Sequence, residues 1–155
     1  MAKPSILFVC TGNCCRSQMA EGLMAAIAED RMEVCSAGSH PTGYVHPVVT
    51  AAMMEIGIDI GQQRSEGLDA FDGRDFDYVV TVCDHARASC PRLAGRLRTY
   101  HWPIDDPISV QSDDDDEAMA AARRARDELM ERVSRLLREI GFEPQERGTS
   151  GGEAS

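Results

Sequence analysis

Residues 9–17, Val9-Cys10-Thr11-Gly12-Asn13-Cys14-Cys15-Arg16-Ser17, place a cysteine and an arginine with five residues between them. The preceding run, Ile6 to Val9, is short, apolar and rich in β-prone residues, as is typical of a buried strand. Downstream, Met19, Leu23 and Ile27 recur at helical spacing. These residues therefore predict a loop that joins the end of a strand to the start of a helix.

Such a loop can bind a tetrahedral oxyanion. Backbone N–H groups at a helix N-terminus lack intrahelical partners, and the helix dipole makes that end positive. Gly12 gives the turn conformational freedom, and the forked guanidinium of Arg16 can donate to two oxygens of the anion. The same positive field favours Cys10 as a thiolate. We therefore predict that Cys10 is a nucleophile directed at a bound oxyanion.

A plainer interpretation treats Cys10 as a buried thiol at a strand end and Arg16 as an ordinary surface charge. A cysteine and an arginine at this spacing occur often by chance, so the pair alone does not decide. The strand before the loop, the glycine within it, Ser17 beside the arginine and the helix after it together favour the catalytic interpretation.

The composition indicates one acidic domain. With 155 residues, 43% of them apolar, the chain can fill a single core, and we assign residues 1–142 to one catalytic domain. Residues 143–155 are rich in Gly, Ser and charge, which predicts a disordered tail. The formal net charge of −10 disfavours nucleic acid and anionic membranes as partners, because both bind clustered Lys and Arg.

The sequence predicts neither a membrane protein nor a secreted one. No apolar run approaches the ~20 residues of a membrane helix, and the segment before Cys10 is too short and too polar at its start for a signal peptide. We therefore expect a soluble, cytoplasmic protein, and a monomer. In that compartment we expect six cysteines to be reduced, catalytic or redox-active rather than paired in structural disulfides.

Strand and helix patterns alternate along the chain. The sequence predicts strands at residues 6–9, 34–37, 78–82 and 97–102. It predicts helices at residues 18–29, 47–56, 65–71, 84–90 and 118–140. This alternation indicates an α/β fold with a parallel sheet and helices on both faces, in which ligands lie beyond the carboxyl ends of the strands. We expect Met53 and Met54, both in the second helix, to lie in the core.

From Cys10 to Gly22 the chain reads Cys-Thr-Gly-Asn-Cys-Cys-Arg-Ser-Gln-Met-Ala-Glu-Gly. This resembles the signature of the low-molecular-weight protein tyrosine phosphatase superfamily, and most closely its thioredoxin-coupled arsenate reductase branch. The resemblance extends to about Ile140 and implies a four-stranded sheet of order 2-1-3-4. Further segments that resemble the branch are Ser36-Ala37-Gly38, Val80-Thr81-Val82-Cys83, Cys90-Pro91 and His101-Trp102-x-x-Asp105-Asp106-Pro107.

The resemblance implies an enzyme that reduces arsenate to arsenite. Cys10 would form a thiolate–arsenate adduct, and Asp106, rather than Asp105, would protonate the departing oxygen. A thiol and disulfide relay would pass from Cys10 to Cys83 and then to Cys90, and thioredoxin would regenerate it. The residues expected to bind substrate are Thr11, Gly12, Asn13, Cys14, Cys15, Arg16 and Ser17.

Spacing supports the relay in part. Neighbouring strands lie about 4.8 Å apart, so thiols at the ends of two adjacent strands can form a disulfide after modest loop movement. Cys83 and Cys90 are seven residues apart, which is ~10.5 Å along a helix, so a bridge between them requires that segment to unwind.

Some positions depart from the pattern of the branch. Cys14 stands where a small hydroxyl residue is common, and Cys35 is outside the motif. Adjacent Cys14 and Cys15 could form only a strained disulfide, so we interpret both as accessory thiols. No cofactor is required, but the resemblance implies a possible potassium site, because some relatives hold a monovalent cation through an Asn, a Glu, a Ser and an Asp. The corresponding residues here are Asn13, Glu21, Ser36 and Glu66.

Two other functions compete with arsenate reduction. A low-molecular-weight protein tyrosine phosphatase acting on aryl phosphates needs only Cys10, Arg16 and Asp106. It would leave Cys83 and Cys90 without a role, and its pocket would call for more aromatic residues than the 5% found here. A non-catalytic oxyanion-binding or redox-sensing module would leave Asp106 unexplained as well.

Overall fold

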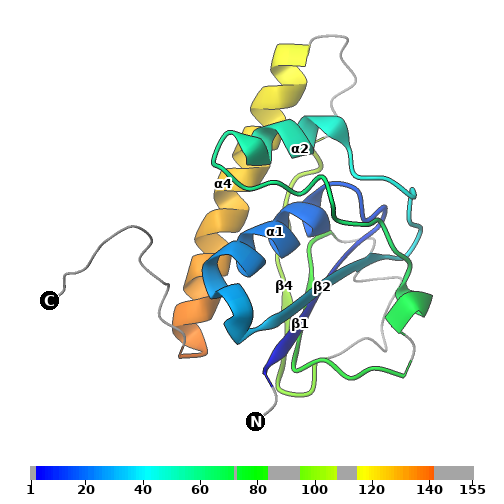
Figure 1. Ribbon diagram of the computed structural model, residues 1–155, viewed down its shortest axis with the longest axis vertical. Coiled ribbons are helices and arrows are strands. Elements are labelled where there is room, and N and C mark those ends of the chain that lie inside the picture. The colour runs from blue at the N-terminus through cyan, green and yellow to red at the C-terminus, as the bar shows by residue number, and fades with distance from the viewer. Residues whose placement is uncertain (1–2, 72, 84–94, 108–114, 142–155) are drawn as a thin grey trace, which may run out of the picture.

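The computed structural model describes residues 3–71, 73–83, 95–107 and 115–141 (Figure 1). Its strands are β1 (Ser5–Cys10), β2 (Glu33–Gly38), β3 (Tyr78–Thr81) and β4 (Arg98–His101). Its α-helices are α1 (Arg16–Ala28), α2 (Pro47–Met54) and α4 (Asp115–Glu139), and its 3-10 turns are η1 (Glu29–Arg31) and η2 (Leu68–Phe71). The four strands form one parallel sheet of order β2-β1-β3-β4, which confirms the predicted order.

β1 lies in the middle of the sheet and is buried along its whole length. A strand with parallel neighbours on both sides and helices above it is shielded from water, which explains its uninterrupted apolar sequence. Its last residues pair with the ends of both neighbours: Cys10 with Gly38 of β2, and Val9 with Thr81 of β3. The segments that follow these three strands therefore emerge at one edge of the sheet.

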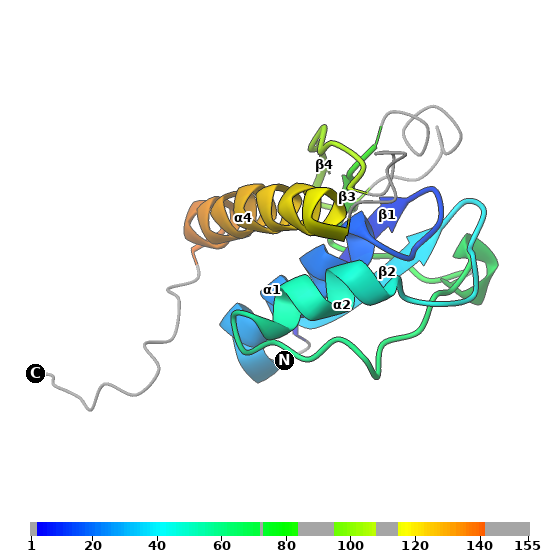
Figure 2. The ribbon, with the colours of Figure 1, turned by 90° about the horizontal axis from the view of Figure 1, so that it is seen from above.

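The helix α4 packs against both α1 and α2. Figure 2 shows them on the same side of the sheet. α1 contacts α4 as well as strands β1 and β2, and its residues Met19, Leu23 and Met24 are fully buried. The stripe predicted from Met19, Leu23 and Ile27 is thus too narrow, because α4 and the segment after α2 cover further sides of the helix. The helix expected at residues 84–90 lies outside the described residues.

A buried charge joins α4 to α2. The Arg126 side chain donates to the backbone oxygen of Ala52 at 2.8 Å and to Glu55 Oε1 at 2.9 Å. Arg123 forms a second ion pair with the same carboxylate, and these two guanidinium groups lower the pKa of Glu55 to about 2. The cations lie at the C-terminal end of α2, where the helix dipole is negative. The sequence analysis did not identify this junction.

Several local predictions need correction. The helix expected at residues 65–71 is only the 3-10 turn η2, and the fourth strand is shorter than predicted. Met54, expected in the core, is 55% exposed, whereas Met53 is fully buried. The tail expected at residues 143–155 lies outside the described residues.

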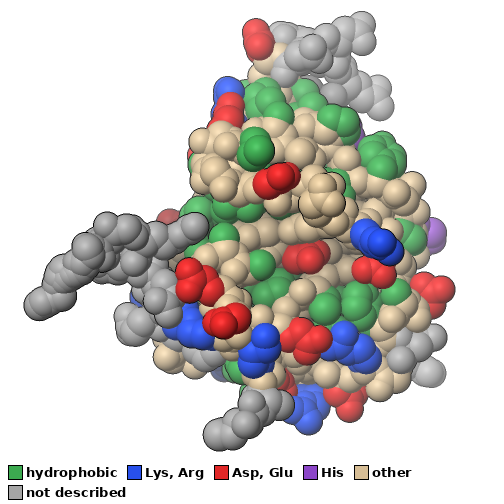
Figure 3. Space-filling model, in the orientation of Figure 1, with side chains coloured by type: hydrophobic (Ala, Val, Ile, Leu, Met, Phe, Trp, Pro, Cys, Tyr) green, Lys and Arg blue, Asp and Glu red, His purple; other side chains and the backbone are tan. Residues whose placement is uncertain are grey.

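The surface carries charged side chains of both signs, as the composition of the sequence predicts. Acidic and basic side chains lie side by side on the face in Figure 3. Among the helices of the described residues, none has the length and apolar character that crossing a membrane requires.

Candidate active site

The loop between β1 and α1, residues 10–16, is hereafter called the anion loop. Its left-handed residue is Asn13, with φ of 47°, a conformation that Asn tolerates better than most residues do. Gly12 does not supply this turn, contrary to the prediction. A Cβ at Gly12 would lie 3.2 Å from Thr42 Cγ2 and 3.3 Å from Cys14 Sγ, so glycine is suited here by close packing.

Neighbouring segments hold the carbonyl groups of the anion loop. The oxygens of Thr11, Gly12 and Cys14 accept hydrogen bonds from the backbone N–H groups of residues 40, 42 and 46, at 2.8–2.9 Å. At Gly38 a Cβ would lie only 2.6 Å from Thr11 O, so only glycine allows the end of β2 this close to the loop. The loop carbonyls are therefore turned toward residues 40–46 rather than toward a bound anion.

Asn13 fixes the loop from inside. Its side chain is fully buried, and Nδ2 donates to Ser17 Oγ at 2.8 Å and to Ser36 Oγ at 3.0 Å. Its Oδ1 accepts from Gln18 Nε2 at 3.1 Å and from the N–H of Glu66 at 2.6 Å. The amide therefore makes two donated and two accepted hydrogen bonds, which fill its capacity. Asn13 acts as a structural centre of the loop.

Gln18 is a positioning residue that the sequence analysis missed. It is fully buried on α1, and its Nε2 also reaches the backbone oxygens of Asn13 at 3.0 Å and of Arg64 at 2.8 Å. It lies within the quoted motif, Arg-Ser-Gln-Met. A polar residue on the buried side of a predicted helix was the signal that could have identified it.

The Cys10 thiol lies at the floor of the loop. Its Sγ is 2.9 Å from Ser17 Oγ and accepts the N–H of Asn13 at 3.2 Å. Burial raises the pKa of Cys10, while the Ser17 and Asn13 contacts and the charge of Arg16 lower it, and burial prevails. The groups expected to favour a thiolate thus act in the predicted direction, but the predicted low pKa is wrong because the sulfur is almost wholly shielded from water.

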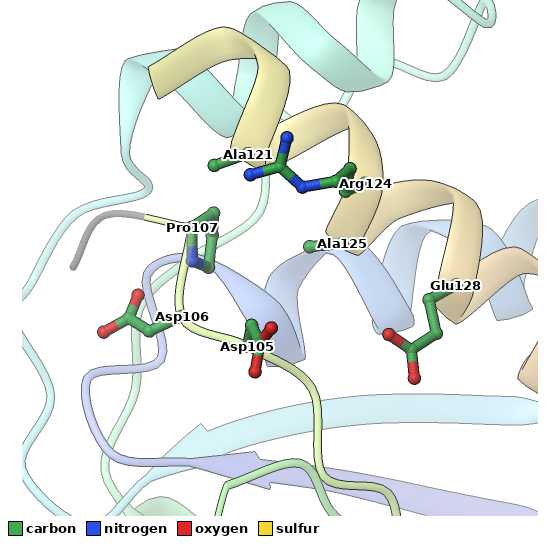
Figure 4. A pocket seen from close by; sticks show the side chains of 7 residues that line it. All are labelled: Asp105, Asp106, Pro107, Ala121, Arg124, Ala125 and Glu128. Carbon is green, nitrogen blue, oxygen red and sulfur yellow. The ribbon is translucent and has the colours of Figure 1, made fainter. Parts of the chain in front are cut away.

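Arg16 joins the anion loop to the segment after β4. Its Nη1 donates to the backbone oxygen of Ile104 at 2.9 Å, and its Nη2 lies 3.8 Å from Asp106 Oδ2. Figure 4 shows the side chains of Asp105 and Asp106 pointing to different sides of this segment, beside a cavity of about 330 Å³ under α4. The structure therefore brings Asp106, the residue expected to act as the acid, to Arg16 and turns the Asp105 side chain to another side of the segment.

Cys83 follows β3 and reaches the same edge of the sheet. The Cys83 thiol is buried, and its Sγ lies 3.3 Å from Oγ1 of Thr11. Thr11 is the residue that follows Cys10 in the sequence. The parallel pairing of β1 with β3 explains this position, because both strands end side by side. Cys90, the third member of the predicted relay, lies outside the described residues.

Cys14 and Cys15 form a close thiol pair. Their sulfurs are 3.5 Å apart, far beyond the ~2.05 Å of a disulfide bond. Hydrogen bonding with Cys15 lowers the pKa of Cys14 to about 7, and the same contact raises the pKa of Cys15. Cys35 is half-buried on β2. None of the cysteines that the structure describes is joined to another in a disulfide.

The residues predicted for a monovalent cation fit it only in part. Glu21, Ser36 and Glu66 line one cavity of about 370 Å³, and Ser36 Oγ donates to Glu21 Oε1 at 2.5 Å. Burial and the charge of Glu66 raise the pKa of Glu21. Asn13 does not offer its oxygen, which already accepts two N–H groups.

A parallel α/β sheet that presents a cysteine, an arginine and a carboxylate around an oxyanion-binding loop defines a class of enzymes with a cysteine nucleophile. The chain belongs to the low molecular weight phosphotyrosine protein phosphatase family, whose model matches residues 5–146.

Relatives within this family carry a more specific name. An arsenate reductase of Halalkalibacterium halodurans is 44% identical over 133 residues, covering 86% of this chain and 94% of that protein. The solved structure of an arsenate reductase in the oxidized state superposes with a TM-score of 0.75 at 31% identity, covering 88% of this chain and 98% of that one. A thioredoxin-dependent arsenate reductase of Corynebacterium glutamicum gives 0.67 at 27% identity, covering 89% of this chain and 62% of that one.

Proposed function

We propose that this protein is an arsenate reductase that reduces arsenate to arsenite through thiol chemistry. The observation that carries the proposal is the position of Cys83, whose sulfur lies 3.3 Å from Thr11 of the anion loop. Hydrolysis of a phosphate ester needs a nucleophile, an arginine and an acid, but no second thiol. Reduction needs two electrons, and the nucleophile and a second thiol beside it supply them together when they form a disulfide. The names of the relatives support the same activity.

The first step joins arsenate to Cys10. Arg16 and the anion loop hold the oxyanion, and the bound dianion, itself a base, takes the Cys10 proton that burial would otherwise retain. The Cys10 sulfur then attacks arsenic, and Asp106 protonates the departing oxygen, which leaves as water. The product is a Cys10–arsenic adduct in which arsenic is still pentavalent.

The second step transfers the electrons. Cys83, as thiolate, attacks the Cys10 sulfur. The sulfur–arsenic bond breaks with its electron pair going to arsenic, which leaves as trivalent arsenite, and a Cys10–Cys83 disulfide forms. Cys90 then attacks Cys83, freeing Cys10 and leaving a Cys83–Cys90 disulfide. Thioredoxin reduces that disulfide, as the name of the Corynebacterium glutamicum relative supports. The relay requires reduced thiols, so we place the protein in the cytoplasm, where one chain acts as a monomer.

The test supplies arsenate, thioredoxin, thioredoxin reductase and NADPH, and follows NADPH oxidation. We expect many turnovers per enzyme for the wild type and for Cys35→Ser, a matched control on β2. Cys90→Ser should stop after one arsenite with a Cys10–Cys83 bridge visible by peptide mapping, and Cys83→Ser should stop without that bridge. Efficient hydrolysis of an aryl phosphate with no arsenate-dependent oxidation would instead establish the phosphatase.

We also propose that Glu21, Ser36 and Glu66 hold a potassium ion, which the raised pKa of Glu21 and the shared cavity support. Potassium chloride should raise the melting temperature more than choline chloride at equal ionic strength. Glu66→Gln should remove that difference in melting temperature. Glu33→Gln, which changes an exposed carboxylate at the start of β2, should retain it. Equal melting temperatures in the two salts would contradict the proposal.

A further inference from the structure

The Cys14 and Cys15 thiols are used by no step of the proposed reaction, although they lie inside the anion loop. Their sulfurs are held 3.5 Å apart. A single thiophilic atom with bonds of about 2.3 Å to sulfur, as in zinc thiolate sites, spreads two sulfurs by roughly 3.5 to 3.8 Å. The pair is therefore already spaced to chelate one such atom, whereas forming a disulfide would require the sulfurs to move much closer together.

The surroundings of the pair place it beside the departing product. The charges of Arg16 and Asp106 both act on Cys14, and those of Asp106 and Cys10 act on Cys15. Cys14 Sγ and Thr42 Cγ2 flank the same side of Gly12, and Thr42 is exposed. The two thiols are themselves buried, with Cys14 6% and Cys15 3% exposed, so the pair lies inside the anion loop close to Cys10, with exposed Thr42 beside it.

We propose that Cys14 and Cys15 form a two-thiol binding site for trivalent arsenic. The inference rests on the proposed function, because arsenite is the product released from Cys10. Arsenous acid, As(OH)₃, would condense with the two thiols: two sulfur–arsenic bonds form, two arsenic–oxygen bonds break, and two water molecules leave. The third ligand of arsenic stays a hydroxyl group, and arsenic remains trivalent, so the step needs neither oxidant nor reductant.

Two features favour arsenic over a metal ion. Trivalent arsenic needs only two sulfurs and a hydroxyl, whereas structural zinc sites use four protein ligands, and the described residues contain no group of three His, Cys, Asp or Glu suited to a metal. Thiolates rather than thiols bind soft elements, and hydrogen bonding with Cys15 brings the pKa of Cys14 down to about 7.

Arsenic bound here would lie in the anion loop and obstruct the next arsenate. The site would therefore make arsenite a strong product inhibitor, with the two thiols setting the arsenite concentration at which turnover slows.

The experiment measures arsenite binding without turnover. The full-length chain carrying Cys10→Ser, Cys83→Ser and Cys90→Ser keeps three of its six cysteines. It is reduced with a phosphine, freed of reductant and mixed with sodium arsenite. We expect one arsenic per chain by native mass spectrometry, and a fall in titratable thiols from three to one. Adding Cys14→Ser or Cys15→Ser should weaken binding by roughly 10²-fold or more, because the second bond is intramolecular, whereas Cys35→Ser should not.

The outcomes separate the site from the proposed function. Circular dichroism checks that each variant is folded, and Cys14→Thr and Cys15→Ala replace any variant that is not. Arsenic that still binds tightly after either thiol is removed, or no binding to the triple variant, would overturn the site. If the wild type fails to reduce arsenate while the triple variant still binds arsenite through both thiols, the reductase proposal fails and the site remains.

Discussion

The two segments that meet at the active site are held in place by different means. The anion loop is fixed by buried hydrogen bonds, with Asn13 making four of them. The segment after β4 reaches the site through Arg16, which bonds to Ile104 O at 2.9 Å and lies 3.8 Å from the Asp106 carboxylate, itself 37% exposed. The loop that carries Cys10, the proposed nucleophile, is thus preorganised, whereas Asp106, the proposed acid, is positioned through Arg16, the residue proposed to bind the substrate. Arg16 couples the two.

The largest effect is expected where this coupling is broken. Arg16→Lys keeps the charge but loses the fork, so it should weaken oxyanion binding and misplace Asp106 together. We expect kcat/KM for arsenate to fall by more than the about 10²–10⁴-fold expected from loss of the acid alone, with KM rising and kcat falling, because binding and proton donation are both impaired. Arg31→Lys, on η1, is the matched control. Inhibition by inorganic phosphate measures binding separately, and a variant that binds phosphate as tightly as the wild type would contradict the shared role.

Asp106→Asn should affect the acid segment alone. Formation of the Cys10 adduct should slow by about 10²–10⁴-fold, because only proton donation in the transition state is lost, while phosphate binding stays. Asp105→Asn, whose side chain points to another side in Figure 4, should react nearly as the wild type does. Rapid quench of a single turnover measures the step. If Asp105→Asn were the slow variant, the acid would be assigned to the wrong residue.

The sequence predicted the anion loop and its flanking strand and helix better than it predicted the segment after β4 that Arg16 contacts. The parallel sheet and the ends of β1 and β3 follow from short apolar runs that alternate with helical patterns, because these are local patterns. The strand order came from the resemblance to the family. The role of Asn13 was not predicted in full, since its partners Ser36 and Glu66 come from distant segments. Gly12 is the residue from which the sequence predicts the conformational freedom of the turn, because glycine has no side chain, yet it is Asn13 that adopts the left-handed conformation.

Burial explains the other failures. A charge pattern indicates which groups favour a thiolate, but the desolvation that raises the pKa of Cys10 depends on how completely the fold covers the sulfur. Met53 and Met54 are adjacent residues of the same type, and nothing in the sequence distinguished one from the other. Only Met53 is buried in the structure. Arg126 is an ordinary charge until α2 is placed beside α4.

A smaller effect should come from the scaffold of the anion loop. Asn13→Ala removes the amide that satisfies Ser17, Ser36 and Gln18, and we expect it to destabilise the protein by about 1–3 kcal/mol in urea unfolding. Asn13→Gly accepts the positive φ without strain but lacks the same bonds. It should therefore recover only the conformational part of the loss. Gln62→Ala, on an exposed residue, is the control. Full recovery in Asn13→Gly would show that the backbone angle, not the hydrogen bonds, fixes the loop.

The smallest effect tests how the loop tunes its nucleophile. Ser17 Oγ lies 2.9 Å from Cys10 Sγ and lowers the pKa of that thiol against the effect of burial. Ser17→Ala should therefore raise the pKa of Cys10 further, so that its alkylation by iodoacetamide begins at higher pH. Peptide mass spectrometry follows the Cys10 peptide alone, and Thr99→Ala on β4 is the control.

The sign of the linked stability follows from the raised pKa of Cys10. A group whose pKa is higher in the folded than in the unfolded state binds its proton more tightly when folded. The resulting stabilisation is complete below the unfolded pKa and is lost as pH rises through the folded pKa. The protein should thus lose stability on the alkaline side, and Ser17→Ala should move the end of that loss to higher pH. An alkylation profile of Ser17→Ala that coincides with the wild type would mean that burial alone sets the reactivity of Cys10, and the anion loop would then position the thiol without tuning it.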